Sequence, residues 1–139
     1  MVSAWSKGTV PEPSVSYWFD DLTRFCQMII AGGGFNGKRL LSEAAVKQAT
    51  SVETGDIKIN GNDVMDYGFG WSVLKKAPGD GRSAGSFGHG GAYKTAMWID
   101  PPKDRIFILL RHQSGETLTP EGKSIEAVFY KSAIASFNN

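Results

Sequence analysis

The chain has 139 residues, of which 41% are hydrophobic and 21% charged, and this composition excludes the disordered and fibrous classes. A chain of this length fits one domain and should bury roughly two thirds of the surface that the unfolded chain exposes. The formal charge is only +1, and no basic run is longer than the pairs Lys38-Arg39 and Lys75-Lys76. We therefore expect no nucleic-acid binding.

The sequence also lacks the signals of membrane, metal and cofactor binding. No apolar run approaches the roughly 18 residues of a membrane span, and residues 1–13 hold no apolar core of a signal peptide. We expect a soluble chain that binds no membrane. The sequence does not predict its cellular compartment, because a chain cut from a longer precursor would have lost any export signal. Two histidines and the single Cys26 have no ligand-like spacing, so we expect no metal and no other cofactor.

Two helices are expected in the first half of the chain. Residues 1–18 have no sustained period, which predicts an extended segment that leads into the fold. Asp20 or Asp21 is a suitable N-cap for a helix that ends at Gly32-Gly33-Gly34. Ser42-Glu43 then opens a short second helix, and residues 51–64 predict a polar surface loop. The apolar side chains of the first helix recur at helical spacing: Leu22, Phe25, Cys26, Ile29 and Ile30.

Strands are expected in the second half. Alternation from Tyr67 to Leu74 predicts one strand with an aromatic face, and a second extended stretch follows around residues 86–91. The apolar segments 93–100 and 105–112, joined by a four-residue connection that contains two prolines, predict a β-hairpin. Residues 106–110 are apolar without alternation, so both faces of that strand should be covered.

A C-terminal helix completes the pattern. Its amphipathic spacing is set by Ile125, Val128, Phe129, Ala133 and Phe137. The order of elements predicts an α+β fold with an antiparallel sheet of about three strands flanked by helices. We expect one domain over residues 19–139.

Several segments, taken in chain order, resemble those of the serine β-lactamase-like hydrolases. This family includes class C β-lactamases, penicillin-binding DD-peptidases and related esterases, and the resemblance covers residues 19–113. It implies that the chain is the C-terminal part of such an enzyme and contributes to its sheet lobe. The matching segments are Asp21–Ile30 with Gly33 and Asn36–Ser42, then Tyr67–Trp71, Gly85–Ala92, and Trp98–Pro101 followed by Asp104.

One motif of this family is present. His89-Gly90-Gly91 is similar to the third motif, which lines the substrate cleft on a strand. Paired glycines beside a cleft allow a substrate carbonyl to approach the backbone, and the amide of Ala92 is a candidate oxyanion donor. The four residues 89–92 are therefore our candidate binding site for a small acyl substrate. The alternative is a histidine at a strand edge whose glycines only form a bulge.

The other two motifs are missing. The family's nucleophile is a serine in a Ser-x-x-Lys helix, and a Tyr-x-Asn motif handles a second proton. None of the 4 tyrosines is followed two positions later by asparagine. Ser72-Val73-Leu74-Lys75 has the right spelling, but in a strand residues three apart point to opposite faces. We therefore name no catalytic residue.

Gly81-Arg82-Ser83-Ala84-Gly85 spells the nucleophile elbow of a different enzyme class, the α/β-hydrolases. The glycine-rich sequence after it does not predict the helix that an elbow needs, so a flexible loop is the preferred interpretation. Were Ser83 a nucleophile, His89 or His112 would be its base and Asp100 its orienting group.

Three functions remain open from the sequence. The first is a fragment or diverged remnant of a β-lactamase-like acyl-hydrolase, not catalytic alone. The second is a non-catalytic binding or assembly module that uses the same sheet, and the third is a small esterase that uses Ser83. Because loss of the N-terminal part would expose a strand edge and apolar surface, we also expect a homo-oligomer or a fold that depends on a partner.

Overall fold

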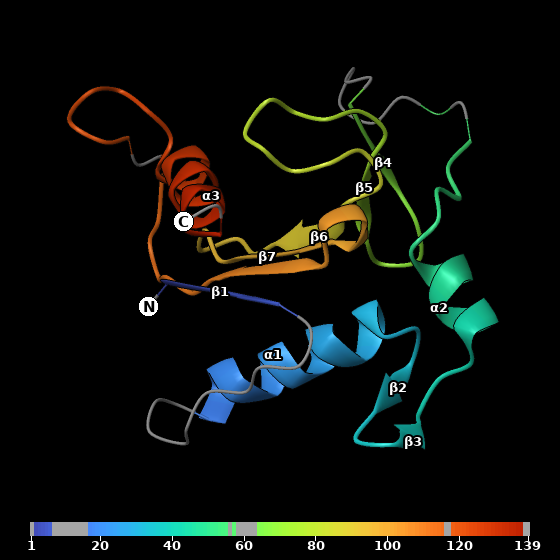
Figure 1. Ribbon diagram of the computed structural model, residues 1–139. Helices are drawn as coiled ribbons and strands as arrows, with labels where there is room; N and C mark the ends of the chain where they lie inside the picture. Colours follow the sequence, from blue (N-terminus) through green and yellow to red (C-terminus); the bar gives the residue numbers. More distant parts are fainter. Residues whose placement is uncertain (1, 7–16, 56, 58–63, 116–117, 138–139) are drawn as a thin grey trace.

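The computed structural model describes residues 2–6, 17–55, 57, 64–115 and 118–137, and only the backbone of residues 2–6, 17 and 18 (Figure 1). An antiparallel sheet of six strands lies at its centre, in the order β1-β8-β7-β6-β5-β4. The strands are β1 (Val2–Ser6), β4 (Met65–Tyr67), β5 (Ser72–Leu74), β6 (Phe87–Gly90), β7 (Ala96–Asp100) and β8 (Arg105–Leu109). The helices are α1 (Tyr17–Ile30), α2 (Glu43–Ala49) and α3 (Ile125–Ser136), and β2 (Gly34–Phe35) pairs with β3 (Lys38–Arg39).

The sheet is covered on both faces, with α1 on one side and α3 on the other (Figure 1). Ile106 and Ile108 of β8 pack with α1, whereas Phe107 and Leu109 pack with α3. All four are at most 5% exposed, which confirms the prediction of a strand covered on both faces. Each such side chain stabilises the fold by about 1.5–3 kcal/mol relative to its exposed state.

The predicted α+β class with an antiparallel sheet is confirmed, but the sheet is larger than expected. Residues 2–6, part of the predicted leading segment, form β1 and pair with β8 from Val2↔Leu109 to Ser6↔Arg105. The partner strand lies about a hundred residues away in the sequence. The pairing of β1 is therefore not specified by any pattern in the neighbouring residues. Residues 7–16 of that segment and 58–63 of the predicted loop lie outside the described residues.

The single strand predicted over residues 67–74 is wrong. The chain turns between β4 and β5, which pair with each other. Gly70 takes a φ of 76°, and a Cβ on Gly68 would lie 2.4 Å from the carbonyl oxygen of Ser51. Gly68 and Gly70 therefore belong to a tight turn that packs on the segment after α2.

The helix ends follow local chemistry. α1 starts at Tyr17, before the predicted N-cap, and ends where Gly33 N donates to Met28 O at 2.9 Å with a positive φ of 96°. Ser42 caps α2 as predicted, because its Oγ accepts from Ala45 N at 3.1 Å. Within the described residues, no helix is long and apolar enough to cross a membrane.

Candidate active-site edge

The second half of β6 has a neighbour on one side only. β7 pairs with all of β6, from Phe87↔Ile99 to Gly90↔Ala96. β5 pairs only with Phe87 and Gly88, because the turn before Ser72 carries the chain away from the sheet. In the part of the chain that the structure describes, His89 and Gly90 therefore face no strand on the β5 side, and both are exposed.

The backbone of Gly90 points toward this open side. Gly91 N donates to Thr95 O at 2.8 Å, so the Gly91 amide faces β7. Amides alternate in direction along an antiparallel strand, which turns the Gly90 N–H away from β7. A Cβ on Gly90 would have only the oxygen of Thr95 near it, at 3.7 Å, whereas one on Gly88 would lie 2.1 Å from the oxygen of Met97. Gly88 is thus required for packing, and Gly90 leaves room for a ligand.

The imidazole of His89 has a defined tautomer. Its Nδ1 lies 2.7 Å from Gly90 O, and a carbonyl oxygen only accepts, so the Nδ1 carries the hydrogen. In the neutral ring, Nε2 then holds a lone pair and can accept a proton or a hydrogen bond. The ring of Tyr67 meets that of His89 edge-on, with 6.3 Å between centroids, and so places β4 beside the open end of β6.

A cavity of about 270 Å³ adjoins the site, on the sheet face that α1 covers in part. Its lining joins His89, Gly90 and Gly91 to an apolar wall. The other lining residues are Leu22, Thr95, Ala96, Met97 and Leu110. The open edge and the cavity together make a small cleft with backbone donors on one side and apolar side chains on the other.

A three-residue turn closes the β6–β7 hairpin beside this cleft. Lys94 N donates to Gly91 O at 2.9 Å, and Lys94 has a φ of 65°. This combination is a turn followed by a left-handed residue at a bulge, a position that favours glycine. Ala92, the first residue of the turn, is exposed at the mouth of the cleft. All four predicted binding residues thus lie at one open end of the sheet.

A family model described as beta-lactamase matches residues 5–127. The chain belongs to the beta-lactamase family. Its fold is similar to that of a penicillin-binding protein homolog from Caulobacter crescentus, with a TM-score of 0.60 and 22% identity over 83% of this chain and 30% of that one. It is also similar to a beta-lactamase from Mycobacterium bovis, with a TM-score of 0.62 and 18% identity over 86% and 44% of the two chains.

A putative 6-aminohexanoate-dimer hydrolase from Bacillus anthracis has the same fold, with a TM-score of 0.53 and 21% identity over 84% of this chain and 27% of that one. This member of the beta-lactamase family therefore spans less than half the length of each of the three structures. No curated protein matches the chain.

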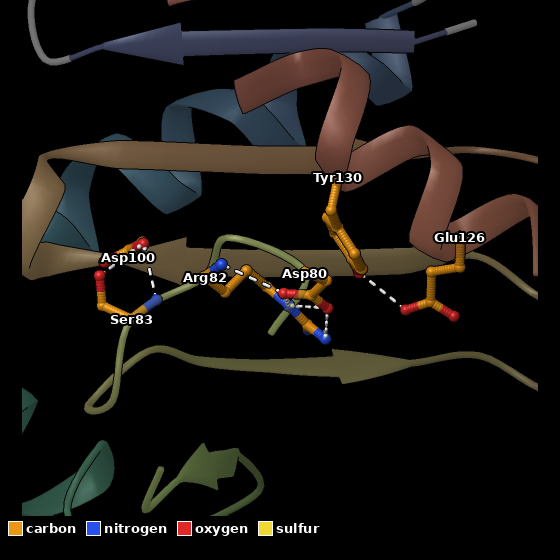
Figure 2. A network of polar contacts seen from close by, with 6 residues as sticks. All are labelled: Asp80, Arg82, Ser83, Asp100, Glu126 and Tyr130. Atoms are coloured by element: carbon orange, nitrogen blue, oxygen red, sulfur yellow. Dashed lines mark hydrogen bonds and ion pairs between the residues drawn. The ribbon is translucent and has the colours of Figure 1, made fainter. Parts of the chain in front are cut away.

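Ser83 is not part of a serine–histidine–aspartate catalytic triad in the described part of this structure. The amide and the hydroxyl of Ser83 both donate to Asp100 Oδ2 at 3.1 Å, so no imidazole stands between them (Figure 2). His89 contacts other residues instead: its Nδ1 lies 2.7 Å from Gly90 O, and its ring meets that of Tyr67. His112 stacks instead on Tyr93. The arrangement expected for a Ser83 esterase is absent from the described residues.

The Ser-x-x-Lys spelling at residues 72–75 does not form a catalytic pair either. Ser72 is buried in β5, at 4% exposure, and is not open to a substrate. Lys75 Nζ lies 2.7 Å from Asp66 Oδ2, a carboxylate that is fully buried. This ion pair engages the lysine amine in a structural contact, which agrees with our rejection of Ser72 and Lys75 as a catalytic pair.

Sequence reasoning missed a polar clamp on the α3 side of the sheet. The guanidinium of Arg82 lies over the rings of both Trp98 and Tyr130, 4.3 and 4.1 Å from their centroids. It also pairs with Asp80 at 2.6 Å (Figure 2). Tyr130 OH donates to Glu126 at 2.7 Å. Burial and then the nearby Glu126 carboxylate raise the pKa of Tyr130. This clamp fixes the loop before β6 to α3, and only the spacing of Asp80 and Arg82 in a glycine-rich loop could have suggested it.

Within the described residues, no three of the histidine, cysteine, aspartate and glutamate side chains gather at a site that could hold a metal ion.

Proposed function

We propose that this chain forms the strand wall of a serine acyl-hydrolase site and is not catalytic alone. The nucleophile would come from polypeptide outside these 139 residues. The observation that carries the proposal is the open edge at residues 89–90, where the Gly90 amide and the free Nε2 of His89 face a cleft. The substrate class is a small acyl ester or amide.

The chemistry of the edge fits this role. A substrate carbonyl can lie against Gly90, because a glycine at that position offers no side chain to block it. Backbone amides at the edge, those of Gly90 and Ala92, would stabilise the negative charge that develops on the carbonyl oxygen. The Nε2 lone pair of His89 would accept a proton from the nucleophile or orient it.

Two further observations support a partner-dependent site. Ser72 is buried in the sheet, and Ser83 is bound to Asp100, so neither is placed as a nucleophile. The chain also covers only 27% to 44% of the similar structures. Both support the interpretation that the catalytic serine lies elsewhere in the protein.

The first test is hydrolysis of p-nitrophenyl butyrate and a chromogenic cephalosporin. The purified chain is assayed alone and as a chimera, in which it replaces the matched part of the Caulobacter crescentus homolog. We expect no turnover by the chain alone and turnover by the chimera. His89→Ala should lower that turnover by roughly 100-fold, whereas Glu121→Gln, in the exposed loop before α3, should leave it unchanged.

Turnover by the chain alone that Ser83→Ala or Ser72→Ala abolishes would overturn the proposal. A folded chimera in which His89→Ala has no effect would remove His89 from the site.

A further inference from the structure

Two exposed aromatic rings stack on each other close in the chain to residues that line the cleft. Tyr93 is 54% exposed, and its ring stacks on that of His112 with 4.5 Å between centroids and 18° between the planes. Aromatic rings attract other rings beyond the gain from area burial, so an ordered pair at the surface is a candidate platform for the ring of a ligand.

Both residues of the stack are close in the chain to residues that line the cavity. Tyr93 sits in the turn between Gly91 and Thr95, and both of these residues line the cavity. His112 follows the cavity residue Leu110 by two positions along the chain. The stack is thus carried by residues next to the cavity wall along the chain, although Tyr93 and His112 are not part of the lining itself.

The backbone holds the stack in place. Gln113 N donates to Tyr93 O at 3.2 Å, and Arg111 Nε donates to Lys94 O at 2.7 Å. The left-handed Lys94 fixes the direction of the turn that carries Tyr93. A ring platform that is ordered before a ligand arrives loses less conformational entropy on binding.

We propose that the Tyr93–His112 pair and the adjoining cavity bind an aromatic ring, so that the substrates of the proposed acyl-hydrolase carry an aryl group. The role in substrate choice rests on the proposed function, whereas the binding itself does not. Tyr93 offers a free ring face, and aryl rings stack on it with an energy beyond that of area burial alone. The apolar cavity walls, Leu22, Met97 and Leu110, then bury the remainder of the group.

On the strand side of the cleft, away from Asp20 and Asp21 of α1, the charge favours a neutral or anionic ring over a cationic one. The sequence from Gly81 to Ile99 contains no acidic residue, and neither does that from Arg105 to Gly115. The positively charged Lys94 and Arg111 lie at this end of the sheet, together with the imidazoles of His89 and His112.

The test is a titration of the full ¹⁵N-labelled chain with 2-naphthol, followed by amide chemical shifts in NMR. Decahydro-2-naphthol, which has the same carbon skeleton without aromaticity, is the matched ligand control. We expect 2-naphthol to bind more tightly and to shift the amides of residues 91–95 and 111–113. Tyr93→Leu, which keeps apolar bulk, should weaken 2-naphthol binding roughly three- to tenfold.

Leu118→Ala is the protein control, because Leu118 is 52% exposed on the connection to α3 and is not among the residues that line the cavity. This variant should bind 2-naphthol as the parent chain does. Equal affinity for the two ligands, shifts confined to other residues, or unchanged affinity in Tyr93→Leu would each overturn the proposal. The titration needs no turnover, so its result is independent of whether the chimera is active.

Discussion

Lys94 holds a backbone conformation that its side chain opposes. Its φ of 65° lies in the left-handed region, which costs a residue with a Cβ about 1–2 kcal/mol. We predict that Lys94→Gly stabilises the chain by about 0.5–1 kcal/mol, because the relief of strain exceeds the added entropy of the unfolded state. Urea unfolding measures this. Asp104→Gly, at a φ of 51°, should gain less, since aspartate tolerates this region better; a lower midpoint for Lys94→Gly would contradict the account.

The buried thiol of Cys26 couples stability to alkaline pH. Burial raises the pKa of its thiol to about 12 from an ordinary value of 9.0. As the pH rises, the unfolded chain therefore loses this proton before the folded chain does. The contribution of the thiol to stability is complete below about pH 9 and is lost as the pH rises from the unfolded to the folded pKa. The loss should approach about 1.4 kcal/mol per pH unit.

Unfolding of the parent chain and of Cys26→Ala from pH 8 to 10.5 isolates this effect. The difference in unfolding free energy between the two should shrink as the pH rises. A difference that is constant over this range would show that the thiol is not buried in its neutral form.

Local chemistry was predictable at this scale, and spatial coincidence was not. The Ser42 cap and the glycines after α1 depend on residues within one helical turn, and both were read from the sequence. The separation of Ser83 from both histidines depends on strand register and on which sheet face each side chain meets. A short sequence motif predicts neither the register of a strand nor the sheet face on which a side chain lies.

Two glycines of β6 have different roles: Gly88 is needed for packing against β7, whereas Gly90 leaves space for a ligand. Gly88→Ala would place a Cβ 2.1 Å from the oxygen of Met97 and 2.6 Å from the ring of Trp98, so we expect a loss of about 1–3 kcal/mol or more. Gly90→Ala meets nothing closer than 3.7 Å and should change stability by less than about 0.5 kcal/mol. Thermal unfolding of both variants checks this, and equal destabilisation would contradict the register of β6 against β7.

The Arg82 clamp joins a loop to a helix, and its contribution should be far larger than that of a surface ion pair. The Arg82 and Asp80 side chains are only 10% and 14% exposed. Arg82→Ala would leave the largely buried Asp80 carboxylate without its partner and remove two ring contacts, so we expect a loss of about 3 kcal/mol. Arg24→Ala, in an exposed pair, should lose at most about 0.5 kcal/mol. A loss in Arg82→Ala as small as that in Arg24→Ala, measured by urea unfolding, would mean that α3 does not depend on the loop.

At the scale of elements, periodicity predicted the helices and the covered strand β8 but misjudged two strands. β1 has a partner that is remote in sequence, and no local pattern specifies such a pairing. The alternation across residues 67–74 fitted a strand equally well as two short strands and a turn, and close contact of Gly68 with the segment after α2 decided the outcome. Tertiary contacts of this kind override a period of two.

The sheet as a whole has one capped end and two open edges. At the β4 end, Glu53 N donates to Tyr67 O at 2.8 Å, and Thr54 Oγ1 accepts from Tyr67 N at 3.3 Å. The open edges among the described residues are the outer side of β1 and the second half of β6. Unpaired strand edges are the surfaces through which sheets extend to other chains.

Exposed apolar side chains accompany the β6 edge. Phe69 is 60% exposed in the turn before Trp71, whose ring stacks on the exposed Phe25 with 6.1 Å between centroids. Val52, 37% exposed, belongs to the segment that packs on this turn. An apolar surface beside an open strand edge favours association.

We predict that the isolated chain forms homo-oligomers as its concentration rises, and sedimentation velocity from 5 to about 200 µM should show the larger species growing. Phe69→Ser should shift the equilibrium toward monomer, because it removes an apolar contact beside the open edge. Leu118→Ser, at a residue 52% exposed on the connection to α3, should have little effect. A single monomeric species at every concentration would mean that neither β1 nor the open half of β6 recruits another chain, and the open half of β6 would then serve as a ligand-facing edge only.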